Sequence, residues 1–272
     1  MPTITTSDGV EIFYKDWGSG QPIVFSHGWP LSSDDWDAQM IYFLHKGYRV
    51  IAHDRRGNGR STQVGAGNDM DHWVADLAAL TEHLGLRDAV HIGHSTGGGE
   101  VARYVARYQD RVAKAVLVAS LTPNMYQSED NPAGQPPEWF DAVQAGILNN
   151  RSEFFRAVPE GPFYGYNRPG AEPSEAVIAN WWRQGMAGSI QASYETVFSW
   201  KEDYTEDLER ITVPVLVMHG EDDQIVPFAS SVPRAVEHLK NGSLKTYPGY
   251  PHGMLTTHAD VLNPDLLAFI QS

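Results

Sequence analysis

The 272-residue sequence contains no cysteine, so disulfides and thiolate metal sites are excluded. It also lacks any apolar run that approaches the length of a membrane span. The first ten residues have neither the basic region nor the apolar region of a secretory signal. From these absences we expect a cytoplasmic protein that has no membrane as a partner.

Positive charge is scarce. The chain has 20 Lys and Arg against 34 Asp and Glu, which gives a formal net charge of −14. A field of that sign repels phosphate backbones and anionic lipids, so we expect no nucleic acid as a partner either. Eleven histidines are present, but neither H-E-x-x-H nor H-x-H spacing occurs, and we therefore expect no metal site.

What the sequence does contain is an alternation of short apolar runs with helix-like segments. Residues 1–121 carry strand-like runs such as 22–25, 48–52 and 89–92, and the alternation resumes in residues 208–272. Strands that alternate with helices are typical of βαβ units. The pattern predicts an α/β fold with a mainly parallel sheet.

Residues 122–207 interrupt this alternation. They are rich in proline, glycine and aromatic residues and contain no buried-strand run. Because the alternation resumes afterwards, we interpret them as a helical cap inserted into a core formed by 1–121 and 208–272. A separate helical domain is the alternative. Insertions that follow strand ends lie over the ligand crevice of α/β folds.

The segment GHSTG, residues 93–97, joins an apolar strand to a helix-like segment. A G-x-S-x-G turn in that context holds its serine in a strained conformation with the hydroxyl exposed, and the glycines avoid collisions with neighbouring backbone. The phosphate-binding alternatives fail, because no P-loop lysine follows and Thr62 replaces the third glycine of a dinucleotide motif. We predict Ser95 as a nucleophile.

A nucleophilic serine needs an imidazole base and a carboxylate that orients the imidazole, in the chain order serine, acid, histidine. Four histidines follow Ser95. His219 lies within an apolar strand and His238 on an amphipathic helix, so we interpret both as structural residues. His252 follows the last strand in a loop stiffened by two prolines, and we predict it as the base. His258 is its rival.

The acid is expected at a strand end between the serine and the base. The segment HGEDDQIVPF offers Glu221, Asp222 and Asp223 there. Asp223 precedes an apolar triplet that turns it inward, so we prefer Asp223 and keep Asp222 as the fallback.

Two N–H groups are needed to stabilise an oxyanion. One is predicted at Thr96, directly after the nucleophile. The other is predicted at Trp29 in the loop FSHGWPLSSDDW, because Pro30 next to it has no N–H. The segment HDRRGNGRS carries three arginines, and we interpret it as a structural turn whose charges brace neighbouring loops.

With these residues assigned, the chain resembles the α/β-hydrolase family, and within it the cofactor-free (non-haem) haloperoxidases and the bacterial aryl and stereoselective esterases. The resemblance lies in the segments KDWGSGQPIVFSHGWPLSSDDWDAQM, GYRVIAHDRRGNGRS, GHSTGGGEVARYVARY, PVLVMHGEDDQIVPF and PHGMLTTHADVLNPDLLAFI. It implies a mostly parallel eight-stranded sheet with helices on both faces and an inserted helical cap. It favours Asp223 over Asp222, and it implies a homo-oligomer, often a trimer. Thr96 departs from the pattern, since many relatives carry Met there.

The resemblance also implies an activity. We expect a serine hydrolase that cleaves small carboxylic esters or lactones through an acyl-enzyme, without a cofactor. Hydrogen peroxide in place of water gives a peracid that oxidises halide. The alternatives are a lyase of the same fold, which forms no acyl-enzyme, and a receptor that binds a small molecule with little turnover.

Overall fold

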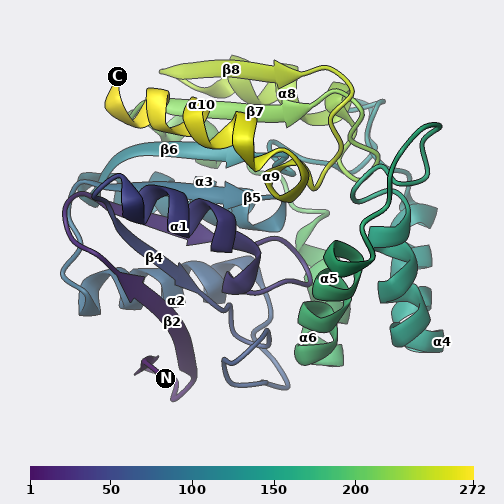
Figure 1. Ribbon diagram of the computed structural model, residues 1–272, viewed down its shortest axis with the longest axis horizontal. Helices are drawn as coiled ribbons and strands as arrows, with labels where there is room; N and C mark the ends of the chain where they lie inside the picture. The colour runs from purple at the N-terminus through teal and green to yellow at the C-terminus, as the bar shows by residue number, and fades with distance from the viewer.

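A computed structural model describes residues 1–272, and eight strands form its single sheet (Figure 1). The strands are β1 (Thr3–Thr5), β2 (Glu11–Trp17), β3 (Pro22–Ser26), β4 (Arg49–His53), β5 (Ala89–His94), β6 (Val112–Val118), β7 (Val215–Gly220) and β8 (Gly242–Tyr247). Their order across the sheet is β1-β2-β4-β3-β5-β6-β7-β8. Only the pairs β1–β2 and β2–β4 are antiparallel, so the mostly parallel sheet is confirmed.

The sequence pattern alone did not indicate β1. This three-residue strand pairs with β2 at the edge of the sheet, with Thr3 opposite Phe13. Three residues are too few to establish an alternating pattern, and only the register with β2 defines the strand.

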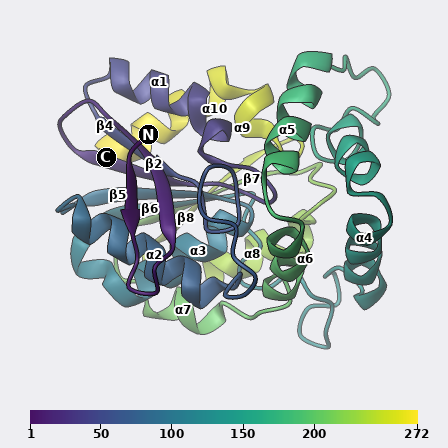
Figure 2. The ribbon, with the colours of Figure 1, turned by 90° about the horizontal axis from the view of Figure 1, so that it is seen from below.

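Helices cover both faces of the sheet (Figure 2). One face carries α1 (Asp37–His45), α9 (Met254–Thr257) and α10 (Ala259–Gln271), and the other carries α2 (Met70–His83), α3 (Thr96–Tyr108) and α8 (Phe228–His238). Successive residues of a strand point to opposite faces. Ile23 and Phe25 accordingly pack in one buried cluster, while Val24 between them packs in the other.

Between β6 and β7 the chain forms α4 (Pro137–Glu160), α5 (Glu175–Ala187), α6 (Ile190–Ser199) and α7 (Thr205–Arg210). The first three stand beside the sheet at the end where its arrows point (Figure 1), and we call them the cap helices. The helix α4 is broken by the non-helical backbone of Asn150. The predicted boundary after residue 207 falls within α7, which packs against α3 and α8 instead of the cap helices.

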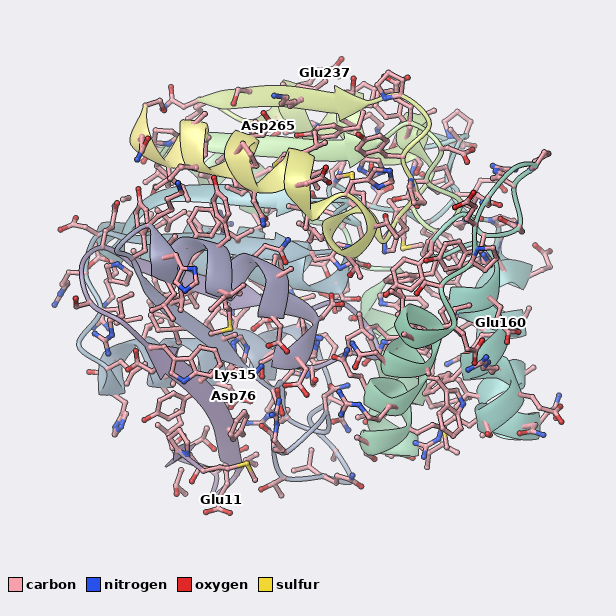
Figure 3. The ribbon with its side chains drawn as sticks, in the orientation of Figure 1. Glu11, Lys15, Asp76, Glu160, Glu237 and Asp265 are labelled. Atoms are coloured by element: carbon pink, nitrogen blue, oxygen red, sulfur yellow. The ribbon has the colours of Figure 1, made fainter.

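Ion pairs tie the elements together, and Figure 3 labels one member of several pairs. Lys15 on β2 lies 2.7 Å from Asp37 of α1, and Asp76 on α2 lies 2.6 Å from Arg56. The three arginines of HDRRGNGRS all pair with carboxylates: Arg55 with Glu100, Arg56 with Asp76 and Arg60 with Asp54. Arg56 and Arg60 also pair with Asp8 and Asp34 of neighbouring loops, so the bracing role predicted for this segment is confirmed. No helix has the length and hydropathy that a membrane span requires.

Candidate active site

The predicted site residues all follow strands of the parallel part of the sheet. Ser95 follows β5, Asp223 follows β7, His252 follows β8, and Trp29 lies in the loop after β3. Parallel strands end at one edge of a sheet, so loops distant in sequence converge there. The cap helices stand at this same edge (Figure 1).

Ser95 occupies a strained turn between β5 and α3. Its φ of 56° and ψ of −118° lie in a region that residues other than glycine seldom adopt. A side chain at Gly93 would overlap the carbonyl of Gly97, and one at Gly97 would overlap the carbonyl of Ser26. The glycines that frame the serine are therefore required by contact with the backbone, as the sequence pattern predicts.

His252 and Asp223 form a buried pair. His252 Nδ1 lies 2.7 Å from Asp223 Oδ2, and each side chain is at most 1% exposed. Because a carboxylate only accepts hydrogen bonds, Nδ1 carries the proton and Nε2 is the free nitrogen of the neutral ring. The backbone N–H groups of Ile225 and Val226 each donate to Asp223 Oδ1 at 2.9 Å.

Asp223 is held in its ionised form. Burial alone raises the pKa of a carboxyl, but the electrostatic interaction with His252 and hydrogen bonds from His219 and His252 outweigh burial here. The net result is a pKa of Asp223 well below its usual range. A permanent negative charge therefore faces the Nδ1–H of His252.

His219 also contacts Asp223, a contact that our interpretation of the sequence did not include. It is fully buried, and its Nε2 lies 2.9 Å from the carbonyl oxygen of Val226 and 3.2 Å from Asp223 Oδ2. Both neighbours are acceptors, so Nε2 carries the proton and is shared between them. We interpreted this residue as part of the strand's core; its position four residues before Asp223 was the available signal.

The alternative residues lie elsewhere. Asp222 forms an exposed ion pair with Arg168, and the ring of His258 stacks on Tyr250 at 3.8 Å. His238 lies 3.1 Å from Glu209 at the surface. Neither Asp222 nor His258 lines the cavity that contains Ser95 and His252.

That cavity is lined almost entirely by apolar side chains. Its 13 lining residues are Trp29, Ser95, Leu121, Met125, Trp139, Val143, Phe154, Val158, Phe163, Trp200, Ile225, Val226 and His252. Eleven of them are hydrophobic, and the other two are Ser95 and His252. The helix α4 contributes a large share of the wall, through Trp139, Val143, Phe154 and Val158.

Ser95 is 9% exposed, and it lines the same cavity as His252. The His252 ring is bonded to Asp223 through Nδ1, which leaves Nε2 as the nitrogen available to the Ser95 hydroxyl. Hydrogen bonds between catalytic groups are often long in a ligand-free enzyme and tighten when substrate binds.

The two predicted oxyanion residues are both anchored to the cap. Thr96 is the first residue of α3, where the N–H has no partner within the helix. Its Oγ1 accepts a hydrogen bond from Trp200 Nε1 at 2.9 Å. The N–H of Trp29 takes part in no backbone hydrogen bond, and its indole Nε1 donates to the carbonyl of Ser193 on α6 at 3.0 Å.

His94, next to the nucleophile, holds the loop of His252 in place. Its Nε2 donates to the carbonyl oxygen of His252 at 3.1 Å, and the two rings lie 4.9 Å apart. Burial and the neighbouring His252 lower the pKa of His94 to about 3, so this imidazole stays neutral. No group of three or more His, Cys, Asp or Glu side chains is arranged to hold a metal ion.

Comparison with known proteins gives one consistent result. The model of the alpha/beta hydrolase fold family matches residues 21–259. A non-heme haloperoxidase of Rhodococcus erythropolis is 62% identical, and a bifunctional esterase/perhydrolase of Acinetobacter calcoaceticus is 59% identical, each over the whole of both chains. Among solved structures, a bromoperoxidase of Bacillus anthracis aligns with a TM-score of 0.94 at 35% identity, covering all of both chains.

Proposed function

The chain belongs to the α/β-hydrolase family, and from this premise we propose that it is a serine hydrolase that cleaves small carboxylic esters or lactones. One observation carries the proposal: Ser95 and His252 are the two polar residues of an apolar cavity, and His252 is bonded to a buried carboxylate. In this proposal Ser95 is the nucleophile, His252 the base and Asp223 the acid.

The reaction runs through an acyl-enzyme. His252 Nε2 accepts the proton of the Ser95 hydroxyl as the oxygen attacks the ester carbonyl. The N–H groups of Trp29 and Thr96 stabilise the oxyanion, and the charge of Asp223 stabilises the imidazolium. The proton then passes to the leaving alcohol, and a water molecule activated by His252 releases the acid and restores the Ser95 hydroxyl.

The lining of the cavity supports an uncharged substrate. No Lys, Arg, Asp or Glu lines it, so nothing there offsets the cost of desolvating a charged acyl or alcohol group. The net charge of −14 further disfavours anionic substrates. Five aromatic side chains in the lining restrict the space beside Ser95, which favours short acyl and alcohol groups.

We further propose that hydrogen peroxide replaces water in the second half of the reaction. Attack of peroxide on the acyl-enzyme forms a peracid and frees Ser95, and the peracid then oxidises halide to hypohalite while becoming the carboxylic acid. Support comes from relatives named as haloperoxidases and as an esterase/perhydrolase. A homo-oligomeric state and a cytoplasmic location remain predictions.

The test is a set of steady-state rates on short-chain esters and lactones, with and without peroxide and bromide. We expect ester turnover, and bromination that requires both peroxide and a carboxylic acid or ester. Ser95→Ala should abolish both activities, whereas the control Ser231→Ala, which alters another buried serine, should retain them. Full ester turnover by Ser95→Ala would refute the proposal.

A lyase or a receptor is distinguished by trapping. Mass spectrometry of the quenched reaction should find one acyl group on Ser95. A lyase of this fold would leave the serine unmodified while consuming its substrate, and a receptor would bind a small molecule tightly with hardly any turnover.

A further inference from the structure

The peptide unit between Gly28 and Trp29 has a fixed orientation. Its carbonyl oxygen, that of Gly28, accepts from His27 Nδ1 at 2.7 Å and from the N–H of Leu31 at 3.0 Å. The N–H of the same planar unit is that of Trp29, and it points opposite to the carbonyl. Two bonds on one end of the unit therefore set the direction of the donor at the other end.

The tautomer of His27 follows from its neighbours. Its Nε2 accepts the backbone N–H of Arg55 at 3.0 Å, so in the neutral ring Nδ1 carries the proton and donates to Gly28. The side chain is fully buried. Burial and the charge of Arg55 lower the pKa of His27 to about 3, which keeps the ring neutral over the ordinary working range.

Arg55 connects His27 to the helix that follows the nucleophile. Its Nη2 donates to the carbonyl of His27 and to Glu100 Oε2, each at 2.7 Å, and its Nε donates to the same carboxylate oxygen at 3.1 Å. Glu100 lies on α3, which begins at Thr96. One buried chain of hydrogen bonds thus links the elements that carry both proposed oxyanion donors.

We propose that His27 is a positioning residue of the oxyanion hole. Arg55 holds the His27 ring in place, and the Nδ1–H of the ring donates a hydrogen bond to the Gly28 carbonyl. This bond orients the Trp29 N–H toward the developing oxyanion. The proposal rests on the proposed function. A donor fixed in advance stabilises the transition state without reorganisation. Hydrogen bonds to the carbonyl also polarise the peptide unit and strengthen its N–H as a donor.

Two substitutions at His27 distinguish the contribution of Nδ1 from that of Nε2. The amide nitrogen of asparagine takes the position of Nδ1, so His27→Asn retains a donor for the Gly28 carbonyl. The longer glutamine places its amide near Nε2, so His27→Gln retains a partner for Arg55 and loses the donor. We expect His27→Gln to lower kcat for p-nitrophenyl acetate by about 10-fold or more, with KM within about twofold of the wild type. His27→Asn should recover most of kcat.

The affinity for a transition-state mimic is a second measurement, and a general loosening of the fold does not change it in the same way as the loss of an oxyanion donor. Phenylboronic acid forms a tetrahedral adduct with an active-site serine and places one oxygen in the oxyanion hole. We expect its affinity for His27→Gln to fall by the same factor as kcat/KM. The matched control is His91→Gln, which replaces another fully buried imidazole, one that stacks on Tyr104 and has no hydrogen-bond partner. Its kcat and boronate affinity should equal those of the wild type.

The outcomes separate this proposal from the proposed function. If wild-type turnover depends on Ser95 but His27→Gln retains wild-type kcat and boronate affinity, the positioning role is wrong and the hydrolase stands. If the wild type turns over no ester, the proposed function is wrong, and the positioning role of His27 is wrong as well because it depends on that function. Should His27→Gln not fold, His27→Asn decides, because it keeps the donor to the Gly28 carbonyl and removes the partner of the Arg55 N–H. A fall of about 10-fold or more in kcat and boronate affinity in His27→Asn would overturn the proposal.

Discussion

The two sides of the cavity are built in different ways. On the core side, around the loop of Ser95, buried charged and hydrogen-bonding side chains join separate elements. The contacts of Glu100 with Arg55 and His53 are an example. On the other side, the cap lines the cavity with aromatic and aliphatic side chains such as Trp139, Val143 and Phe154. Hydrogen bonds and ion pairs impose direction, whereas apolar packing tolerates changes of shape. We infer that the core places the reacting atoms and the cap selects what enters.

The largest effect is expected at Asp223, on the core side. Asp223→Asn keeps the size of the side chain but removes the charge that faces His252 Nδ1–H and disturbs the tautomer of the ring. We expect kcat for ester hydrolysis to fall by about 10³- to 10⁴-fold, as measured by steady-state kinetics. Asp222→Asn, a neighbouring carboxylate in an exposed ion pair, is the control and should retain wild-type kcat. Equal losses in both variants would contradict the assignment.

A second prediction concerns the stability of the core network. Burial raises the pKa of Glu100, but the charges of Arg55 and His53 and their hydrogen bonds lower it from 4.5 to about 2. The native state therefore binds this proton less readily than the unfolded chain does. This contribution to stability is fully present above about pH 4.5 and is lost as the pH falls toward 2.

Glu100→Gln should remove that part of the pH dependence. Denaturant titrations from pH 7 to pH 2 should show a shallower acid decline of the unfolding free energy in the variant. At pH 7 the variant should be less stable by about 3 to 5 kcal/mol, because the charge of Arg55 is left buried and unpaired. An acid decline as steep as that of the wild type would assign the effect to other carboxylates.

Most of the fold and the three predicted triad residues could be inferred from the sequence, because each depends on a local pattern. The glycines around Ser95, the apolar triplet after Asp223 and the prolines around His252 are visible within a few residues. The proposed role of His27 depends on Arg55, which follows a different strand, and the contact of His219 with Asp223 depends on how the chain turns after β7. A lone histidine beside an apolar strand gives no sign of such a partner. The three-residue β1 was missed for the same reason, since pairing alone defines it.

On the cap side we expect a change in selectivity with little change in chemistry. Val143→Ala shortens a side chain in the part of the cavity wall that α4 forms, and so enlarges the cavity. The ratio of kcat/KM for a butyrate ester to that for an acetate ester should rise by roughly 10-fold, the scale of one or two methylene groups in an apolar pocket. The control is Leu148→Ala on the same helix, whose side chain is 64% exposed. If Val143→Ala instead lowers kcat on every ester alike, the division between core and cap is wrong.

The smallest effect is expected where the two sides meet. Thr96→Val keeps the N–H of Thr96 but removes the acceptor of Trp200 Nε1. We expect a loss of about 1 to 3 kcal/mol in unfolding free energy from the unpaired indole, with kcat lowered by a few-fold. Adding Trp200→Phe removes the donor as well and should restore part of the stability. Additive losses in the double variant would show that the hydrogen bond contributes nothing.

The central claim is that the Ser95 hydroxyl is activated by His252. The most direct test is labelling with a fluorophosphonate, followed by mapping of the modified residue by mass spectrometry. We predict one label per chain, on Ser95, formed at least about 10³-fold more slowly in His252→Gln. Labelling of another residue, or labelling of Ser95 at the wild-type rate in His252→Gln, would contradict the account.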